Sequence, residues 1–355
     1  MAISVYIGST SGFAGKNLIL LSMALKLQQE GYKIGFMKPV GFNPFSEKEV
    51  VVDKDALFIK DVLRIEDPLD LVNPVVFTYD LQVETFTKGC KDFKGKIKEA
   101  YEEISKGKDI VFLCGSGSFL YMGKFCEISG IDIAKLLKAK VILIDRFFKE
   151  FLYDYVIATK EVLDKELIGV ILNGVPETKQ SFVNDLLVPM FKRKDIEVLG
   201  VIPEDPFLRS IKVSEIAERL GGKIIVEAQK SDTVVENFLI GTMQVENFMV
   251  HFKKRKNSAV IVGGDRSDIQ LVAIESGCPC LILTGNLYPN DIILSKAEVH
   301  KVPIIVVRED TYTVAKMMEE VLSSIKLIDI DKVNHGFKLI SSNLNWDFIK
   351  KSLGL

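Results

Sequence analysis

Several residue types on which functional sites often depend are scarce in this sequence. Only three histidines and one tryptophan occur among 355 residues. With so few histidines, a catalytic site built on a histidine base is not expected. Charge of one sign is also lacking, because 46 Lys and Arg residues stand against 48 Asp and Glu residues, for a formal net charge of -2. A nucleic-acid or anionic-membrane surface needs a basic field. We therefore expect neither a nucleic acid nor a membrane as a partner.

Long apolar runs are lacking as well. Each apolar stretch has the length of a strand and is interrupted by charge, whereas a transmembrane helix needs about 20 apolar residues. Residues Met1–Ile7 lead directly into a strand pattern, without the basic and cleavable apolar segments of a secretory signal. These features predict a cytoplasmic protein.

Cysteine is sparse, and its spacing does not suggest a metal site. An odd number of cysteines without paired metal spacing favours reduced thiols. The apolar run after the closely spaced pair near residue 280 favours buried structural thiols over a redox or metal pair. The five cysteines are Cys90, Cys114, Cys126, Cys278 and Cys280.

Short runs rich in Ile and Val alternate with longer amphipathic segments. Continuous apolar strands separated by helices predict an α/β fold, with a parallel sheet covered on both faces and ligands at the carboxyl ends of the strands. The predicted strands are Ile3–Ile7, Lys33–Lys38, Ile110–Cys114, Val141–Asp145, Leu167–Leu172 and Glu197–Ile202. The predicted helices are Lys16–Glu30, Lys54–Leu63, Lys91–Ser105 and Glu177–Phe191.

The pattern changes near Pro203–Pro206, and a second, smaller α/β unit follows. A short helical piece there ends at Gly221-Gly222, a flexible point that we take as the region of the domain boundary. We assign residues 1–212 to the first domain, 213–327 to the second, and 328–355 to a helical tail that contains Trp346. Strands of the second domain are predicted at Lys223–Glu227, Ala259–Val262, Cys280–Leu283 and Ile304–Val307.

A loop of small residues, Gly8–Asn17, joins the first predicted strand to the first predicted helix. Such a loop presents backbone N–H groups at a helix N-terminus, where anions are stabilised, and Lys16 would add a positive charge for phosphates. This predicts a P-loop NTPase-like sheet. The predicted phosphate-binding residues are Ser11, Gly12, Gly15, Lys16 and Asn17. The alternative is an ordinary strand-to-helix turn with a surface lysine.

Two positions depart from the G-x-x-x-x-G-K-[ST] pattern. Thr10 stands where the first glycine belongs, and Asn17 replaces the hydroxyl residue that coordinates Mg²⁺.

The loop, together with Lys38-Pro39-Val40 and the segment Asp53–Leu57, resembles dethiobiotin synthetase. The resemblance implies that Lys38 lines the active site, with a catalytic role beside Lys16, and that Asp55 helps to hold a metal. The alternatives are that Lys38 is a solvated strand end and that Asp55 is a helix N-terminal carboxylate.

The same family has an acidic metal ligand in the loop after the strand Ile110–Cys114, and Cys114 occupies that position here. A neutral thiol is a poor Mg²⁺ ligand, because hard cations take oxygen donors. Together with Asn17, this puts Mg²⁺ binding and efficient hydrolysis in doubt. Asn173, before Gly174, resembles the asparagine that touches the nucleotide base in these proteins; a turn-forming Asn is the equal alternative.

The second domain carries Gly264-Asp265-Arg266, which resembles the signature of the DRTGG domain. A second loop with Asn286 follows the next predicted strand. We expect Asp265, Arg266 and Asn286 to converge on a small anion or nucleotide. The alternative is an Asp–Arg ion pair and a helix cap that hold the loop together.

Nearly the whole chain resembles the N-terminal region of the longer bacterial phosphate acetyltransferases. The resemblance implies a nucleotide-binding regulatory or scaffolding protein that binds ATP or another purine nucleotide, hydrolyses it weakly or not at all, and forms homo-oligomers. It also implies that the acetyl-transferring domain lies outside this sequence, so no acetyltransferase activity is expected. One alternative is an ATP-dependent carboxylate-amine ligase of the dethiobiotin synthetase class. Another is a small-molecule sensor that binds ligand through the DRTGG domain.

Overall fold

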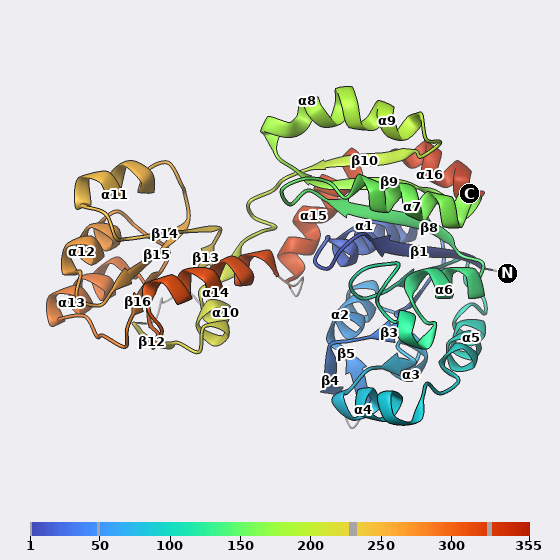
Figure 1. Ribbon diagram of the computed structural model, residues 1–355, viewed down its shortest axis with the longest axis horizontal. Helices are drawn as coiled ribbons and strands as arrows, with labels where there is room; N and C mark the ends of the chain where they lie inside the picture. Colours follow the sequence, from blue (N-terminus) through green and yellow to red (C-terminus); the bar gives the residue numbers. More distant parts are fainter. Residues whose placement is uncertain (1, 48–49, 227–232, 325–328) are drawn as a thin grey trace. The chain divides into compact units, whose positions relative to one another are not determined.

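The computed structural model describes residues 2–47, 50–226, 233–324 and 329–355. The chain divides into two compact units (Figure 1): unit 1 comprises Met1–Glu204 with Leu327–Leu355, and unit 2 comprises Asp205–Lys326. The division therefore falls between Glu204 and Asp205. Gly221 and Gly222, expected to mark the boundary region, instead join a helix to a strand inside unit 2.

Unit 1 is built on the predicted parallel sheet. All neighbouring strands of this sheet pair in parallel, in the order β10-β9-β8-β1-β7-β2. The strands are β1 (Ile3–Ser9), β2 (Ile34–Met37), β7 (Ile110–Cys114), β8 (Lys140–Arg146), β9 (Leu167–Val175) and β10 (Val198–Pro203). Each of the six predicted strands is present, so the continuous apolar runs were interpreted correctly.

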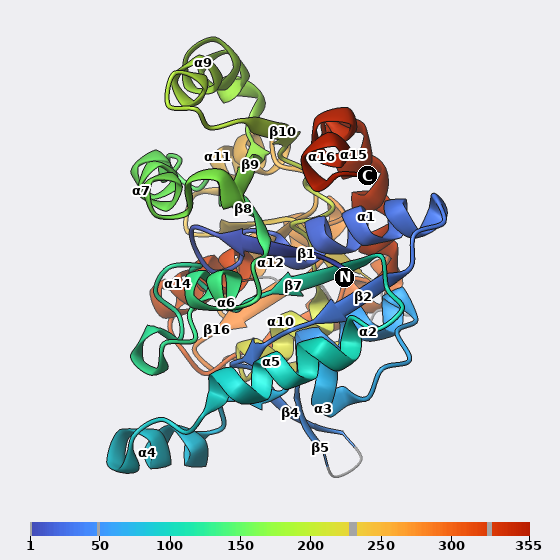
Figure 2. The same ribbon diagram turned by 90° about the vertical axis from the view of Figure 1, so that its right-hand side faces the viewer.

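Helices cover both faces of this sheet (Figure 2). Successive side chains of a strand point to opposite faces, so Val5 and Ile7 join one core cluster while Tyr6 joins the other. The first cluster includes residues of α1 (Lys16–Gln29) and α2 (Lys54–Leu63). The second includes residues of α5 (Phe93–Ile104), α6 (Gly130–Leu136) and α7 (Tyr153–Leu163).

The C-terminal segment of the chain also belongs to unit 1. Helices α15 (Ile330–Asn343) and α16 (Trp346–Leu353) add Ile340 and Ile349 to the first core cluster. Gly336 of α15 faces Leu18 of α1 so closely that an added Cβ would lie 2.6 Å from Leu18 Cδ2. Glycine at this position lets the two helices approach.

Several elements of unit 1 do not follow from the sequence pattern. They are β3 (Val40–Gly41), β4 (Pro44–Glu47), β5 (Val50–Asp53), α3 (Leu69–Val72), β6 (Val75–Val76) and α4 (Tyr79–Lys88). The predicted helix Glu177–Phe191 is one continuous helical segment, but its type changes along it: a 3-10 turn (Glu177–Lys179) is followed by α8 (Gln180–Phe182), a π turn (Val183–Leu187) and α9 (Val188–Lys192). Pro189 in α9 has no N–H to donate to the Asp185 carbonyl four residues earlier, and the π turn lies where that α-helical hydrogen bond is missing.

Unit 2 has a five-stranded sheet of its own, in the order β12-β17-β16-β15-β14, with only β12 antiparallel to its neighbour among the described strands. The strands are β12 (Lys223–Val226), β14 (Asn237–Ile240), β15 (Ser258–Gly263), β16 (Leu281–Thr284) and β17 (Ile304–Val306). The helices are α10 (Val213–Arg219), α11 (Val245–Phe252), α12 (Ser267–Glu275), α13 (Asp291–His300) and α14 (Thr311–Ser323). The sequence did not predict β14 or α11, and the predicted strand end at Glu227 lies outside the described residues.

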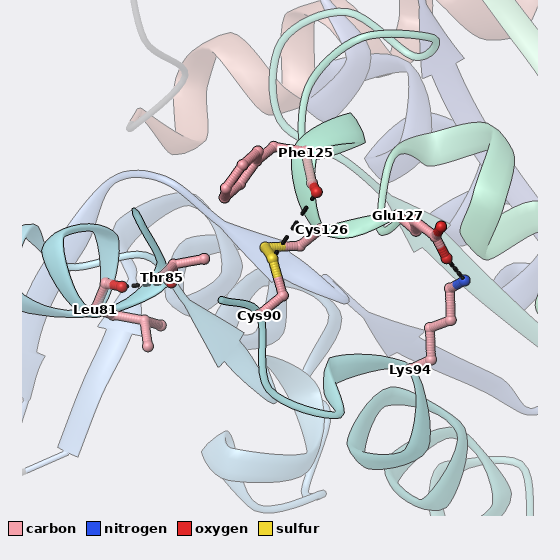
Figure 3. The surroundings of a disulfide bond; sticks show 7 residues. All are labelled: Leu81, Thr85, Cys90, Lys94, Phe125, Cys126 and Glu127. Carbon is pink, nitrogen blue, oxygen red and sulfur yellow. Dashed lines mark hydrogen bonds and ion pairs between the residues drawn. A yellow bond between two sulfur atoms is a disulfide. The ribbon is translucent and has the colours of Figure 1, made fainter. Parts of the chain in front are cut away.

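The cysteines differ from the expectation of five reduced thiols. Cys90, after α4, and Cys126, in a 3-10 turn after β7, form a disulfide (Figure 3). Two residues 36 positions apart can meet only through the tertiary fold, so spacing did not predict this pair. The other three cysteines are buried and free, and burial raises the pKa of the Cys278 thiol to about 12. Cys278 and Cys280 are thus the buried thiols that their apolar context predicted.

Candidate functional site

The loop between β1 and α1 has the backbone of an anion-binding turn. Phe13 and Gly15 have φ values of 53° and 91°, so the loop turns twice through the left-handed region before α1 begins. Gly15 is the N-cap residue and lacks a side chain with which to cap the helix. The first N–H groups of a helix have no intrahelical partner, and the helix dipole adds positive potential there. This end of α1 is therefore suited to bind a phosphate.

Lys16 is buried beside the loop that follows β7. Its Nζ donates to Ser9 Oγ at 2.7 Å and to the Gly117 carbonyl at 3.1 Å. Burial lowers the pKa of Lys16 to about 8, with a further lowering by Lys38 that Cys114 and Asp55 oppose. The ammonium is thus charged at neutral pH and is held by two neutral acceptors, which leaves its charge available to an anion. The alternative of a surface lysine is wrong.

The depressed pKa of Lys16 predicts a pH-dependent phosphate affinity. The protonated amine attracts phosphate, so affinity should be full below pH 8 and fall by up to about tenfold per unit above it. Nucleotide titrations from pH 7.5 to 9.5 measure this. The Lys16→Arg variant stays charged throughout and should bind with a flat profile. An equal fall in both proteins would assign the effect to another group.

Lys38 lies at the end of β2 and is fully buried rather than solvated, so the alternative of a solvated strand end is wrong. Its Nζ contacts Asp53 Oδ1 at 2.7 Å and Asp55 Oδ2 at 3.2 Å. Burial alone would lower the pKa of Lys38, but the two carboxylates raise it on balance. Lys38 is therefore a charged, paired lysine.

The two carboxylates that pair with Lys38 have different roles. Asp53 is completely buried, caps α2 through the Asp55 N–H, and accepts the N–H groups of Phe42 and Asn43. Asp55 lies in the first turn of α2, as the helix-terminus alternative supposed, and its carboxylate also contacts Lys38. Asp53 carries more of this network than Asp55, and the sequence analysis did not single it out.

The residues near the loop include two that differ in donor chemistry from the expected Mg²⁺ ligands. Cys114 ends β7 completely buried, and burial raises the pKa of its thiol to about 12, so it stays neutral. Asn17 offers an amide in place of a hydroxyl, and Asp55 is already engaged by Lys38. Across the described part of the chain, no group of three or more His, Cys, Asp or Glu side chains is placed to hold a metal ion.

Asn173 contacts the phosphate loop directly. Its Nδ2 donates to the Ala14 carbonyl at 2.9 Å, and an added Cβ on Gly15 would lie 2.4 Å from the same nitrogen. Asn173 reaches the loop from the carboxyl end of β9, and Gly174 after it turns with φ 71°. Asn173 thus lies at the predicted phosphate loop, and its side-chain amide holds the loop backbone at Ala14.

In unit 2, the loops after β15 and β16 lie against each other. An added Cβ on Gly264 would lie 2.3 Å from the Leu287 Cβ, so these loops touch. Arg266 forms a two-point ion pair with Asp268, at 2.9 Å for each contact, and donates to the Met243 carbonyl. The Asp–Arg pair is thus present, with Asp268 as the acid rather than Asp265.

Asn286 of the second loop has φ 57° and donates its backbone N–H to the Val307 carbonyl at 2.8 Å. The loops that carry Asp265 and Asn286 are therefore adjacent, as the strand order requires. Ligand binding by Asp265, Arg266 and Asn286 stays a prediction.

Comparison with known proteins agrees with this two-part organisation. Residues 4–212 match the family model described as AAA domain, and residues 215–321 match that described as DRTGG domain. The phosphate acetyltransferase of Synechocystis sp. is 21% identical over 362 residues, which cover 97% of this chain and 51% of that protein. The phosphate acetyltransferase of Nitratidesulfovibrio vulgaris is 24% identical, with 97% and 51% covered. The predicted resemblances to a DRTGG domain and to half of these enzymes are confirmed.

Another relative is the cobyric acid synthase of Clostridium botulinum, which is 24% identical over 65% of this chain and 50% of that protein. The chain spans about half the length of the curated relatives it matches. Among solved structures, a chain of the MinC:MinD complex of Aquifex aeolicus aligns with 58% of this chain over 83% of its own length. The sequence identity is 17% and the TM-score is 0.36. The structure of the CBS and DRTGG domains of Clostridium perfringens pyrophosphatase, complexed with diadenosine tetraphosphate, aligns with 41% of this chain over 70% of its own length. The sequence identity is 16% and the TM-score is 0.30.

No helix among the described residues combines the length and the apolar character that crossing a bilayer requires.

Proposed function

The chain belongs to the AAA domain family through residues 4–212, and from this premise we propose that it is a nucleotide-binding regulatory or scaffolding protein that hydrolyses ATP weakly or not at all. The observation that carries the proposal is the loop before α1, where Lys16 stays charged beside an uncapped helix N-terminus. Backbone N–H groups and one lysine can hold the phosphates of ATP or another purine nucleotide without further protein charge.

The donor set near the loop supports weak turnover. Phosphoryl transfer relies on metal ions and cations placed to stabilise the charge that develops in the transition state. Here Cys114 is a neutral thiol and Asn17 an amide, while the Lys38 charge is matched by Asp53 and Asp55. Binding can persist without those groups, whereas rapid hydrolysis requires them.

The ligase alternative is less well supported by the same contacts. In that reading Lys38 stabilises a transferring phosphoryl group, but its Nζ is buried against two carboxylates. The matches to phosphate acetyltransferases cover only about half of those proteins, so their activity is not proposed for this chain. We propose instead that this chain acts on a partner or a second copy through its nucleotide state.

Calorimetric titration of ATP, ADP and GTP into the wild-type protein and the Lys16→Ala variant tests the proposal. We expect wild-type binding that changes little when Mg²⁺ is removed, and a loss of about 100-fold or more in the variant, since a buried cation that contacts phosphate is deleted. Thr159→Val, which removes a buried hydroxyl within α7, is a matched control and should bind normally. Wild-type protein that binds none of the three nucleotides would refute the proposal.

A further inference from the structure

The phosphate loop is fixed from one side by the ends of two neighbouring strands. Thr10 Oγ1 donates to Asp145 Oδ1 at 2.7 Å, and both side chains are buried. The Thr10 N–H donates to the Ile144 carbonyl at 3.0 Å. Asp145 and Ile144 belong to β8, which lies beside β1 in the sheet. The start of the loop is therefore tied to β8 by both its side chain and its backbone.

The next residue of β8 contacts the tip of the same loop. Arg146 Nη1 donates to the Phe13 carbonyl at 2.7 Å, and Phe13 has the left-handed backbone that turns the loop. With Asn173 holding the Ala14 carbonyl from β9, three strand-end side chains secure three loop residues. Lys16 contacts Ser9 and Gly117 instead, so its amine is not part of this set.

Asp145 is the buried member of this set, and both of its oxygens are used. Oδ1 accepts from Thr10, and Oδ2 accepts the Leu152 N–H at 2.8 Å. A buried carboxylate costs free energy that an apolar residue of similar size would avoid. Its position at the carboxyl edge of a parallel sheet, where ligands bind, gives a functional reason for tolerating that cost.

We propose that Asp145 is a positioning residue, which through Thr10 holds the phosphate loop in the conformation that binds nucleotide. This inference rests on the proposed nucleotide binding and deepens it. It also explains Thr10, which stands where the phosphate-loop pattern has glycine: glycine could not donate a hydroxyl to Asp145. The start of the loop, which glycine-rich loops shape by flexibility, would here be fixed by the Thr10–Asp145 hydrogen bond, while Arg146 and Asn173 hold the loop tip.

Two variants of Thr10 test the inference. Thr10→Val keeps the shape and removes the hydroxyl, and should weaken nucleotide binding about 10-fold or more, the effect of losing a hydrogen bond to a charged group. Thr10→Ser keeps the hydroxyl and should bind within about threefold of wild type. A side chain that serves only to fill space would give the opposite order, because valine fills the site better than serine. That order would overturn the proposal.

Combining substitutions tests whether Thr10 and Asp145 act together. Asp145→Asn replaces one accepting oxygen by an NH₂ group and should also weaken binding. The double variant Thr10→Val/Asp145→Asn should bind about as weakly as the worse single variant, since one interaction is lost in both cases. Fully multiplicative losses would mean that the two residues act independently, which contradicts the proposal.

Hydrogen exchange in the ligand-free protein separates this inference from the proposed function. The amide of residue 10, which donates to the Ile144 carbonyl, and the Ile19 amide, which donates to the Gly15 carbonyl, should exchange at least about 10-fold faster in Thr10→Val than in wild type or Thr10→Ser, while those of α7 stay unchanged. This result would support the positioning role even if no nucleotide bound. Unchanged exchange in Thr10→Val would overturn it, whatever the nucleotide affinity proved to be.

Discussion

Replacing Lys38 by Ala should lower the free energy of unfolding of unit 1 by about 3–5 kcal/mol, the usual effect of removing one partner of a buried ion pair. The reason is Asp53, which is completely buried and contacts Lys38 at 2.7 Å. Without the lysine, its carboxylate keeps backbone donors but loses its counter-charge. Urea unfolding followed by fluorescence measures this loss. The single tryptophan, Trp346, packs on the core of unit 1 and reports on that unit.

A paired substitution distinguishes the buried charge from lost packing. Lys38→Met/Asp53→Asn removes both charges at nearly constant volume, and should recover at least half of the stability lost in Lys38→Ala. A loss below about 1 kcal/mol in Lys38→Ala, or no recovery in the pair, would contradict this account of the site. The stability of the Lys38→Ala variant must also be known before a loss of activity in that variant can be assigned to catalysis, because an unfolded protein is inactive as well.

Removing the Cys90–Cys126 disulfide should lower the free energy of unfolding of unit 1 by about 2–4 kcal/mol. The bridge closes a segment of 36 residues, and the loss of that constraint increases the conformational entropy of the unfolded chain. Close by, Lys94 and Glu127 form an exposed ion pair that contributes little (Figure 3). The disulfide is therefore a covalent link between the segment after α4 and the turn after β7.

The measurement compares Cys90→Ser/Cys126→Ser with the wild-type protein, each with and without dithiothreitol. Reductant should lower the stability of the wild type to that of the double variant and leave the variant itself unchanged. The buried free thiols Cys114, Cys278 and Cys280 are common to both proteins and cancel in the comparison. A wild-type protein unaffected by reductant, with five thiols detected after denaturation, would contradict the disulfide.

The architecture of both sheets was accessible from sequence because their parallel strands are buried on both faces. Runs such as Ile110–Cys114 and Val141–Ile144 are apolar without interruption, and the amphipathic segments between them can cover only one face each. The antiparallel pair β4–β5 escaped prediction because Phe45 and Val51 are both exposed although they lie on opposite faces of the pair, so the expected alternation of apolar and polar residues is missing. Likewise β14 is the last strand in the order of its sheet and only Leu239 in it is buried, so it lacks the continuously buried run that marks its neighbours.

The part of the candidate site that could be predicted is the part formed by residues adjacent in the sequence. The Gly15-Lys16 turn is contiguous, and its anion-binding character depends on a strand, a loop and a helix in that order. The contacts of Thr10 with Asp145, of Phe13 with Arg146, and of Lys38 with Asp53 join residues that only the folded sheet brings together. Their charges and hydroxyls were visible in the sequence, but their partners were not.

The central claim, a nucleotide bound by the Lys16 loop and turned over slowly, is tested most directly by phosphate release at saturating ATP and Mg²⁺. Ordinary enzymes turn over about 1–10³ times per second. We predict a rate well below about 1 per second that does not depend on Mg²⁺, in protein shown by calorimetry to be saturated with ATP. Mg²⁺-dependent release at about 1 per second or faster, lost in Lys16→Ala, would contradict the account and revive ATP-driven chemistry at this site.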